Sequence, residues 1–307
     1  MRAYMGALSI NWRCGSGCSK QSEEADRGEE SIVDSDQTIR DFGAQWLRHP
    51  ENDGYYASVE MFRDICGPLL QPSDVEGRRV ADLGSGSGRI VEMLLDCGAA
   101  HVTAVEPSDA IHVLRENTSG RADRITYVHG TADCLPPGDY DVVVSIGVLH
   151  HVPEPGPAVA RALEMLKPGG RLLVWLYGRE GNEIYLAFAG PLRRVTSRIP
   201  DGLLRALCRG LVPLLSGYAW LCRWIPLPMR GYMRSVITPL RWRHRSLVIF
   251  DQLNPAYAKY YSERKARALI QDAGFSDVEI YHRHGYSWTV SGRKPATIDQ
   301  TARQRRP

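Results

Sequence analysis

The chain has 307 residues, of which 43% are hydrophobic and 24% are charged, and its formal net charge is +3. A chain of this length and composition can bury a complete α/β core and has room for about one further module. The small net charge excludes a strong overall electrostatic attraction to nucleic acid.

The N-terminal part of the chain is polar and then aromatic. Residues 1–36 are predicted to be a disordered tail, because their second half is rich in Glu and Asp. No charged-then-apolar signal peptide is present, so a cytoplasmic location is expected. Residues 37–76 are predicted to form a helical cap that carries aromatic side chains, among them Trp46 and Tyr56.

The most informative segment is Val80–Ile90, where an apolar strand meets a helix through alternating glycines. Glycines at this spacing let the backbone turn tightly and let a ligand lie against bare peptide groups. The helix that follows presents its free N–H groups to whatever lies on the loop. The segment therefore predicts a nucleotide or nucleoside cofactor, with contacts to Asp82, Gly84, Ser85, Gly86 and Gly88.

The spacing and the nearby acids narrow the choice of cofactor. A dinucleotide fold prefers G-x-G-x-x-G, whereas here the third glycine comes one residue earlier. Asp82 suits a cation or an amino group better than a diphosphate, and S-adenosylmethionine (SAM) carries both a sulfonium and an ammonium. Glu106 ends a second apolar strand and is placed to accept hydrogen bonds from a ribose, which fits either cofactor. Asp133 follows the next strand and can bind an adenine amine.

Two further strands complete the pattern. Tyr140–Ser145 reads as a fully buried strand, and Leu166–Gly170 turns into the strand Arg171–Leu176. With these motifs in register over roughly residues 78–178, the chain resembles the class I SAM-dependent methyltransferases, particularly their small-molecule branch. The motifs that carry the resemblance are DLGSGSGR, AVEPS, the segment 130–133, DVVVSIGVLHH and LKPGGRLLVWL.

The resemblance implies an α/β fold, a seven-stranded Rossmann-like sheet with an N-terminal helical cap and a helical insertion after the fifth strand. The core would span residues 77–178, the insertion 179–250, and a last helix and strand pair 251–295, before a flexible tail at 296–307. In such a fold the cap often closes over the cofactor, so Trp46 and Tyr56 are candidate substrate contacts, with simple packing as the alternative. The further cofactor contacts that the resemblance implies are Glu106, Pro107, Ala132, Asp133, Ser145 and Ile146.

The expected reaction moves a methyl group from SAM to a hydroxyl, amine or carbon of a small or lipid-like acceptor. A base is needed only if the acceptor keeps its proton at working pH. His150 and His151 follow the fourth strand at the edge where active sites of such sheets lie, and imidazole has a suitable pKa. Bracing of the loop is the alternative role for this pair. Tyr177, after the fifth strand, is a further substrate candidate.

The insertion is basic and apolar. Eleven arginines and a single acid, Asp201, lie between positions 193 and 245. Leu203, Leu207, Leu211 and Leu215 recur every four residues and predict one apolar helix face. The longest uncharged run is too short to span a bilayer, and Pro213 is expected to interrupt it. The segment is interpreted as a lid over the substrate, as a peripheral membrane contact, or as a plainly packed helical subdomain.

Other classes of function remain as alternatives. An NAD(P)-dependent oxidoreductase shares the strand–glycine–acid pattern but is disfavoured by the glycine spacing, by Asp82 and by Asp133. A SAM-binding protein without methyl transfer would carry the same binding residues. Nucleic-acid binding through the arginines is disfavoured because the insertion has many leucines of the buried type and no RNA-binding motif. No metal site is expected, since the one close cysteine pair, Cys14 and Cys18, lacks a second pair.

Overall fold

The computed structural model describes residues 12–13, 35–183, 185–187, 192, 196, 199–253 and 258–296. Residues 297–307 of the predicted flexible tail and nearly all of the predicted tail at 1–36 lie outside these residues, as do Cys14 and Cys18. Within the described part, helix α1 begins at Ser35, and the two residues Trp12–Arg13 form a short strand, β1. That strand is a departure from the prediction of a wholly disordered tail.

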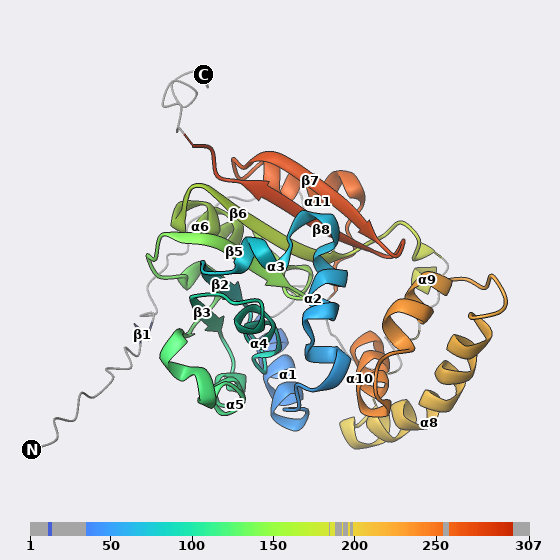
Figure 1. Ribbon diagram of the computed structural model, residues 1–307. Coiled ribbons are helices and arrows are strands. Elements are labelled where there is room, and N and C mark those ends of the chain that lie inside the picture. The colour runs from blue at the N-terminus through green and yellow to red at the C-terminus, as the bar shows by residue number, and fades with distance from the viewer. Residues whose placement is uncertain are drawn as a thin grey trace, which may run out of the picture.

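A mixed sheet forms the centre of the molecule (Figure 1), and it contains the seven predicted strands. Their order is β4-β3-β2-β5-β6-β8-β7, and β1 adds a two-residue strand beside β4. The strands from β1 to β6 pair in parallel, whereas β8 runs antiparallel to both β6 and β7. The seven strands are β2 Arg79–Leu83, β3 His101–Glu106, β4 Ile125–His129, β5 Tyr140–Ile146, β6 Leu166–Tyr177, β7 Ser276–Arg283 and β8 Ser287–Arg293.

Helices cover both faces of this sheet. One hydrophobic cluster joins one face to α2, α4 and α5, and a second cluster joins the other face to α6 and α11. Near-continuous apolar runs in β2, β3 and β5 are what burial on both faces requires. The helices of the cap and core are α1 Ser35–Arg48, α2 Val59–Cys66, α3 Pro72–Val75, α4 Arg89–Asp96, α5 Ala110–Asn117, α6 Gly156–Met165 and α11 Glu263–Gln271.

In the described residues from 199 onward, the predicted insertion forms three further α-helices beside the sheet. These are α8 Asp201–Leu221, α9 Arg230–Tyr232 and α10 Trp242–Leu253, and a π-helical turn, Met233–Ile237, follows α9. Helix α8 lies outermost, and α10 lies between it and the cap helices α1 and α2 (Figure 1). The last of these helices runs three residues past the predicted boundary at 250. Ala219, Met233 and Leu247 belong to the same hydrophobic cluster as Val80 and Ile90, so the insertion packs directly on the core.

Two details of α8 differ from the sequence prediction. The helix continues through Pro213 instead of breaking there. The predicted leucine stripe is also divided, because Leu203 and Leu207 are 64% and 45% exposed, whereas Leu211 and Leu215 are half-buried. The side that packs against the protein is one residue further on and consists of Leu204, Cys208, Val212 and Ala219. Within the described chain, every helix is too short or too polar to cross a bilayer.

Candidate active site

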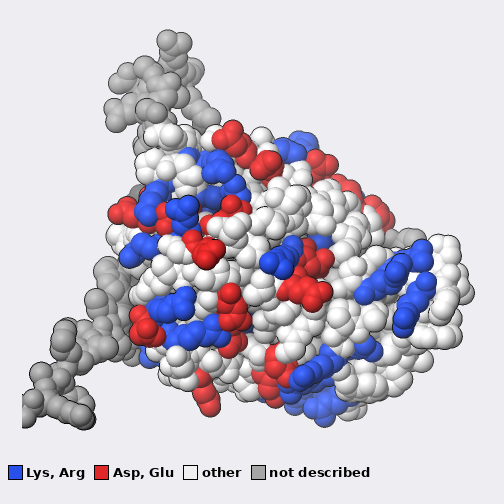
Figure 2. All heavy atoms as spheres, in the orientation of Figure 1, with Lys and Arg blue, Asp and Glu red and all other residues white. Residues whose placement is uncertain are grey.

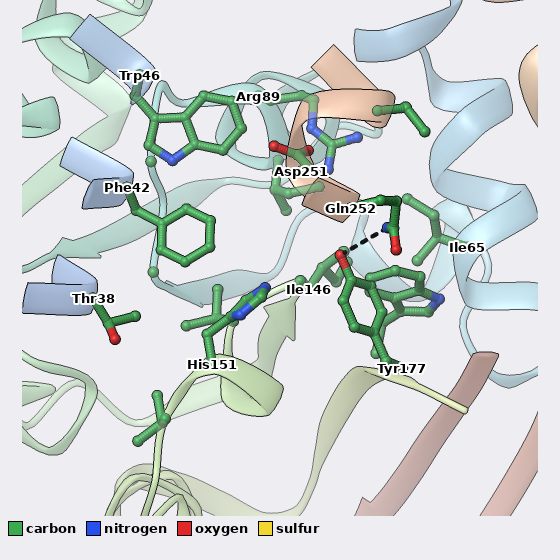
Figure 3. Close-up of a pocket in the computed structure, with 18 of the residues that line it drawn as sticks. Thr38, Phe42, Trp46, Ile65, Arg89, Ile146, His151, Tyr177, Asp251 and Gln252 are labelled. Atoms are coloured by element: carbon green, nitrogen blue, oxygen red, sulfur yellow. Dashed lines mark hydrogen bonds between the residues drawn. The ribbon is translucent and has the colours of Figure 1, made fainter. Parts of the chain in front are cut away.

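A large cavity opens at the carboxyl ends of the parallel strands. Its volume is about 1330 Å³, above the range of about 300–1,000 Å³ typical of pockets for one small ligand. The loops after β2, β3, β4, β5 and β6 all contribute to its lining, and α1 and α10 complete the walls (Figure 3). The cavity therefore has room for a nucleoside cofactor together with a second molecule.

Most of the predicted site residues line this one cavity. They come from the cap, from the glycine loop and from four strand ends: Trp46, Tyr56, Gly84, Ser85, Gly86, Glu106, Pro107, Ala132, Asp133, Ile146, His151 and Tyr177. The four predicted residues that the structure does not bring to the lining are Asp82, Gly88, Ser145 and His150. The proposed roles of the residues in both groups stay predictions.

The glycine loop is fixed from below by a carboxylate. Glu106, at the end of β3, accepts a hydrogen bond from the Gly86 backbone N–H at 2.8 Å. Its other oxygen accepts bonds from the Ser108 backbone N–H at 3.0 Å and from the Ser108 hydroxyl at 2.5 Å. Burial nevertheless raises the pKa of Glu106. The residue predicted to bind a ribose thus also holds the loop on which the cofactor would lie.

Close packing by protein side chains explains why the loop needs glycine. Gly84, Gly86 and Gly88 have φ angles of +80°, +52° and +90°, which side chains rarely tolerate. A Cβ atom on Gly86 would lie 2.9 Å from the indole nitrogen of Trp46, and one on Gly84 would lie 2.5 Å from Val148. Protein side chains thus occupy part of the space beside these glycines. The cap contacts the loop directly.

Asp82 and Ser145 lie within their strands rather than on the cavity wall. Asp82 is 1% exposed, and burial raises the pKa of its carboxyl group to about 7. Ser145 is fully buried and donates a hydrogen bond to the Leu83 carbonyl at 3.3 Å. Both side chains lie below the loop, where they support the ends of β2 and β5.

The two histidines occupy different environments although they are adjacent in sequence. His150 is fully buried, and its ring lies 3.9 Å from that of Tyr177 and 4.2 Å from that of His151. Burial lowers the pKa of His150 well below its usual value, so it is neutral at working pH. His151 lines the cavity, with its ring 4.6 Å from that of Phe42 on α1 (Figure 3). Of the pair, only His151 is placed to meet an acceptor.

The sequence analysis missed several polar residues of the cavity as site residues, among them Arg89, Asp251 and Gln252. Arg89 opens α4, and Asp251 and Gln252 lie on α10, far from the recognised motifs. Gln252 lies 3.5 Å from the Tyr177 hydroxyl, to which it donates a hydrogen bond (Figure 3). The signal that could have revealed Asp251 is its place as a lone charge after the apolar run Leu247–Phe250. Within the residues that the structure covers, no cluster of His, Cys, Asp and Glu could hold a metal ion.

Comparison with known proteins identifies a methyltransferase domain within the chain. A family model described as "Methyltransferase domain" matches residues 81–174, which run from β2 into β6. The chain is 27% identical over 176 residues to the ubiquinone biosynthesis O-methyltransferase of Methylococcus capsulatus, covering 56% of this chain and 70% of that protein. It is 34% identical over 132 residues to the enzyme of that name from Xylella fastidiosa, covering 42% of this chain and 53% of the relative.

Among solved structures, human N-acetylserotonin methyltransferase in complex with SAM is 14% identical to this chain, with a TM-score of 0.47. The likeness covers 85% of this chain and 57% of that one, and at this score it adds no argument of its own. The family match and the cavity at the strand ends agree with the motifs read from the sequence. The chain contains a methyltransferase domain and resembles the class I SAM-dependent methyltransferases.

Proposed function

We propose that this protein transfers the methyl group of SAM to a hydroxyl group of a small, largely apolar molecule. The observation that carries the proposal is a single cavity that joins the glycine loop to apolar walls from the insertion. The curated relatives are named as O-methyltransferases, which favours a hydroxyl over an amine or a carbon as the acceptor. The chain spans 70% of the first of these relatives and about half of the other, so the acceptor is part of the proposal.

The cofactor would lie across the strand ends. Glu106 would accept hydrogen bonds from the ribose hydroxyls, and Asp133, exposed after β4, would accept one from the adenine amine. The strand order places these two residues at neighbouring strands, β3 and β4. A dinucleotide fold prefers G-x-G-x-x-G, whereas the third glycine of this loop comes one residue earlier. This spacing favours SAM over NAD(P), and the oxidoreductase alternative is not favoured.

The acceptor would lie toward the insertion. That side of the cavity is lined by aliphatic side chains, which come from α8, from the segment around the π-helical turn and from α10: Leu211, Leu215, Met229, Met233, Val236, Ile237, Leu240, Val248 and Leu253. Such a surface binds an apolar body by the hydrophobic effect and excludes water. We therefore propose a lipid-like acceptor, with the insertion acting as its lid.

When bound, SAM supplies an electrophilic methyl group on a sulfonium. The residues of the protein then have to hold the acceptor oxygen behind that methyl group at about 3–3.5 Å, in line with the bond that breaks. His151 and Tyr177 line the cavity beside the ends of β5 and β6 and would orient the acceptor hydroxyl. A neutral ring nitrogen of His151 could also accept the hydroxyl proton, as a general base does.

The outer surface of the insertion suits a lipid surface. Leu214, Trp220 and Trp224 are 70%, 57% and 73% exposed. Positively charged side chains, all of them Arg in the insertion, lie among uncharged surface in this part of the molecule (Figure 2). Apolar groups flanked by cations bind interfaces that carry anionic headgroups. We propose a peripheral membrane contact here, which would bring the cavity close to a lipid-like acceptor.

Two experiments test the proposed function. Calorimetric titration should show saturable binding of S-adenosylhomocysteine, the demethylated product, and none of NAD. Incubation with methyl-labelled SAM and a lipid extract should transfer label to an extracted compound, whereas heat-denatured protein should transfer none. Binding of NAD alone would refute the choice of cofactor. Binding without any labelled product, from either lipid or aqueous extracts, would instead favour a binding protein that does not transfer methyl groups.

A further inference from the structure

Two opposite charges face each other at one end of the cavity, and the reaction proposed above gives neither a role. Arg89 is the first residue of α4 and directly follows Gly88 in the glycine loop. Asp251 lies on α10, in the insertion, 162 positions further along the chain. Both side chains line the cavity (Figure 3), and the positive charge of Arg89 acts on the carboxyl group of Asp251.

Contacts with the cap hold the Arg89 side chain in place. Its Nη1 donates a hydrogen bond to the Tyr56 carbonyl at 3.3 Å, and its guanidinium lies 4.4 Å from the centre of the Tyr56 ring. These contacts use one of the five N–H donors and one face of the group. Arg89 is half-buried and lines the cavity.

Asp251 is held in a similar way. One carboxylate oxygen accepts a hydrogen bond of 2.6 Å from the Gln45 amide on α1, and Gln45 is only 4% exposed. Burial raises the pKa of Asp251 to about 7, although Arg89 acts in the opposite direction. Among the residues that the structure covers, no ion pair joins Arg89 to Asp251. Arg89 and Asp251 are each fixed by other residues but form no ion pair with each other. Such an arrangement suits a ligand that has both a negative and a positive group.

The orientation proposed for the bound cofactor would bring a group with both charges to the end of the cavity where Arg89 and Asp251 lie. The residues assigned to ribose and adenine follow β3 and β4, so the other end of the cofactor must extend across β2 toward β5. That end is a methionyl group, which carries an α-carboxylate and an α-ammonium. Arg89 lies there because α4 begins directly after the glycine loop that follows β2.

We propose that Arg89 and Asp251 form the binding site for the methionyl end of SAM, with the carboxylate on Arg89 and the ammonium on Asp251. This inference rests on the proposed function, and it assigns to the insertion a direct contact with the cofactor. The bound methionyl group would then link α4 to α10. Loading of the cofactor would order the wall against which the acceptor binds.

Ligand pairs that differ only at the methionyl end test the inference. Calorimetry on the full chain would compare S-adenosylhomocysteine with 5′-methylthioadenosine, which lacks the amino acid group. A charge-assisted hydrogen bond lost from a buried site weakens binding by about 10–100-fold. Arg89→Gln and Asp251→Asn should each weaken binding of the first ligand by such a factor and change binding of the second by less than about threefold. The control is Arg209→Gln on the exposed side of α8, which should change neither.

A measurement on the unaltered protein tests the inference even if one of the variants fails to fold. Removing only the carboxylate of S-adenosylhomocysteine, to give its decarboxylated analogue, should weaken binding at least tenfold, and Arg89→Gln should abolish this discrimination. Equal losses for both nucleosides in the variants, or no loss for either, would overturn the inference while leaving SAM binding intact. If the unaltered protein binds neither nucleoside, the proposed function itself fails.

Discussion

Replacing Gly86 by alanine probes the contact between the cap and the glycine loop. Gly86 has a φ of +52°, and an added Cβ would lie 2.9 Å from Nε1 and 3.2 Å from Cε2 of Trp46. The left-handed conformation alone costs a residue with a side chain about 1–2 kcal/mol. Displacement of the indole adds to this cost, because a contact below 3.0 Å cannot be kept. We expect the free energy of unfolding to fall by about 2 kcal/mol.

The Gly86→Ala substitution should also lower the affinity for the cofactor. The Gly86 N–H is bonded to Glu106, and Trp46 and Glu106 both line the cavity, so moving any of the three disturbs the proposed ribose site. A loss of about 1–2 kcal/mol corresponds to a 5–30-fold weaker binding of S-adenosylhomocysteine. Chemical denaturation measures the first quantity and titration calorimetry the second. Gly120→Ala is the matched control, because Gly120 has no atom within 4 Å of its added Cβ and no positive φ.

A double-mutant cycle separates the two causes. In a Trp46→Ala background the steric part of the Gly86→Ala cost should disappear, while the backbone part stays. The coupling energy between the two positions should therefore exceed about 0.5 kcal/mol, which is the lower limit for residues in contact. If Gly86→Ala costs the same with and without Trp46, or no more than Gly120→Ala, the packing described for the loop is wrong.

Three other predictions concern separate parts of the molecule. Burial raises the pKa of Asp82 from 3.8 to about 7, so the folded state loses stability as pH rises from about 4 to about 7, where the buried group has to ionise. Asp82→Asn removes this loss and should therefore gain about 2–3 kcal/mol relative to the unaltered protein between pH 5 and pH 8, as measured by urea denaturation at both values. His151→Ala should lower label transfer from SAM at least 100-fold with unchanged affinity for S-adenosylhomocysteine, whereas a comparable loss in affinity would place His151 on the cofactor side. Leu214→Glu and Trp224→Glu should reduce co-sedimentation with anionic vesicles severalfold without lowering the melting temperature, because both side chains are exposed, and unchanged sedimentation would argue against the membrane contact.

The core of the fold was predictable because its signals are local. Each parallel strand is a short apolar run ended by Gly, Asp or Glu, and its neighbours in the sheet follow from the family resemblance. Glu106 was predicted at the end of β3, and the structure places it there, on the cavity wall. Strand burial explains why such runs are continuous rather than alternating, and this pattern is visible in the sequence alone.

The other features of the site depend on tertiary packing, which patterns in the local sequence do not predict. His150 and His151 are equivalent by type and position, but a short 3₁₀ turn, Leu149–His151, directs one ring into the core and the other to the cavity. Asp251 reaches the cavity only because α10 packs beside α1, a contact between segments 206 positions apart in the Gln45–Asp251 bond. Contacts at such separations are set by the whole fold.

The prediction of one apolar leucine face on α8 differed from the structure for a related reason. Both Leu203 and its neighbour Leu204 begin apolar series with a helical period, so periodicity cannot say which series faces the protein. The structure buries the second series and divides the first between solvent and the cavity. A helix that is apolar on more than one side gives an ambiguous prediction of its own orientation.

The shared hydrophobic cluster has a thermodynamic consequence. Because side chains of the insertion and of the sheet are buried in one continuous cluster, the two parts should melt together in a single cooperative transition. Any molecule that binds the insertion would then raise the melting temperature of the whole protein in proportion to the logarithm of its concentration. A thermal-shift screen of hydrophobic phenols and lipids could thus reveal the acceptor without any assay of turnover.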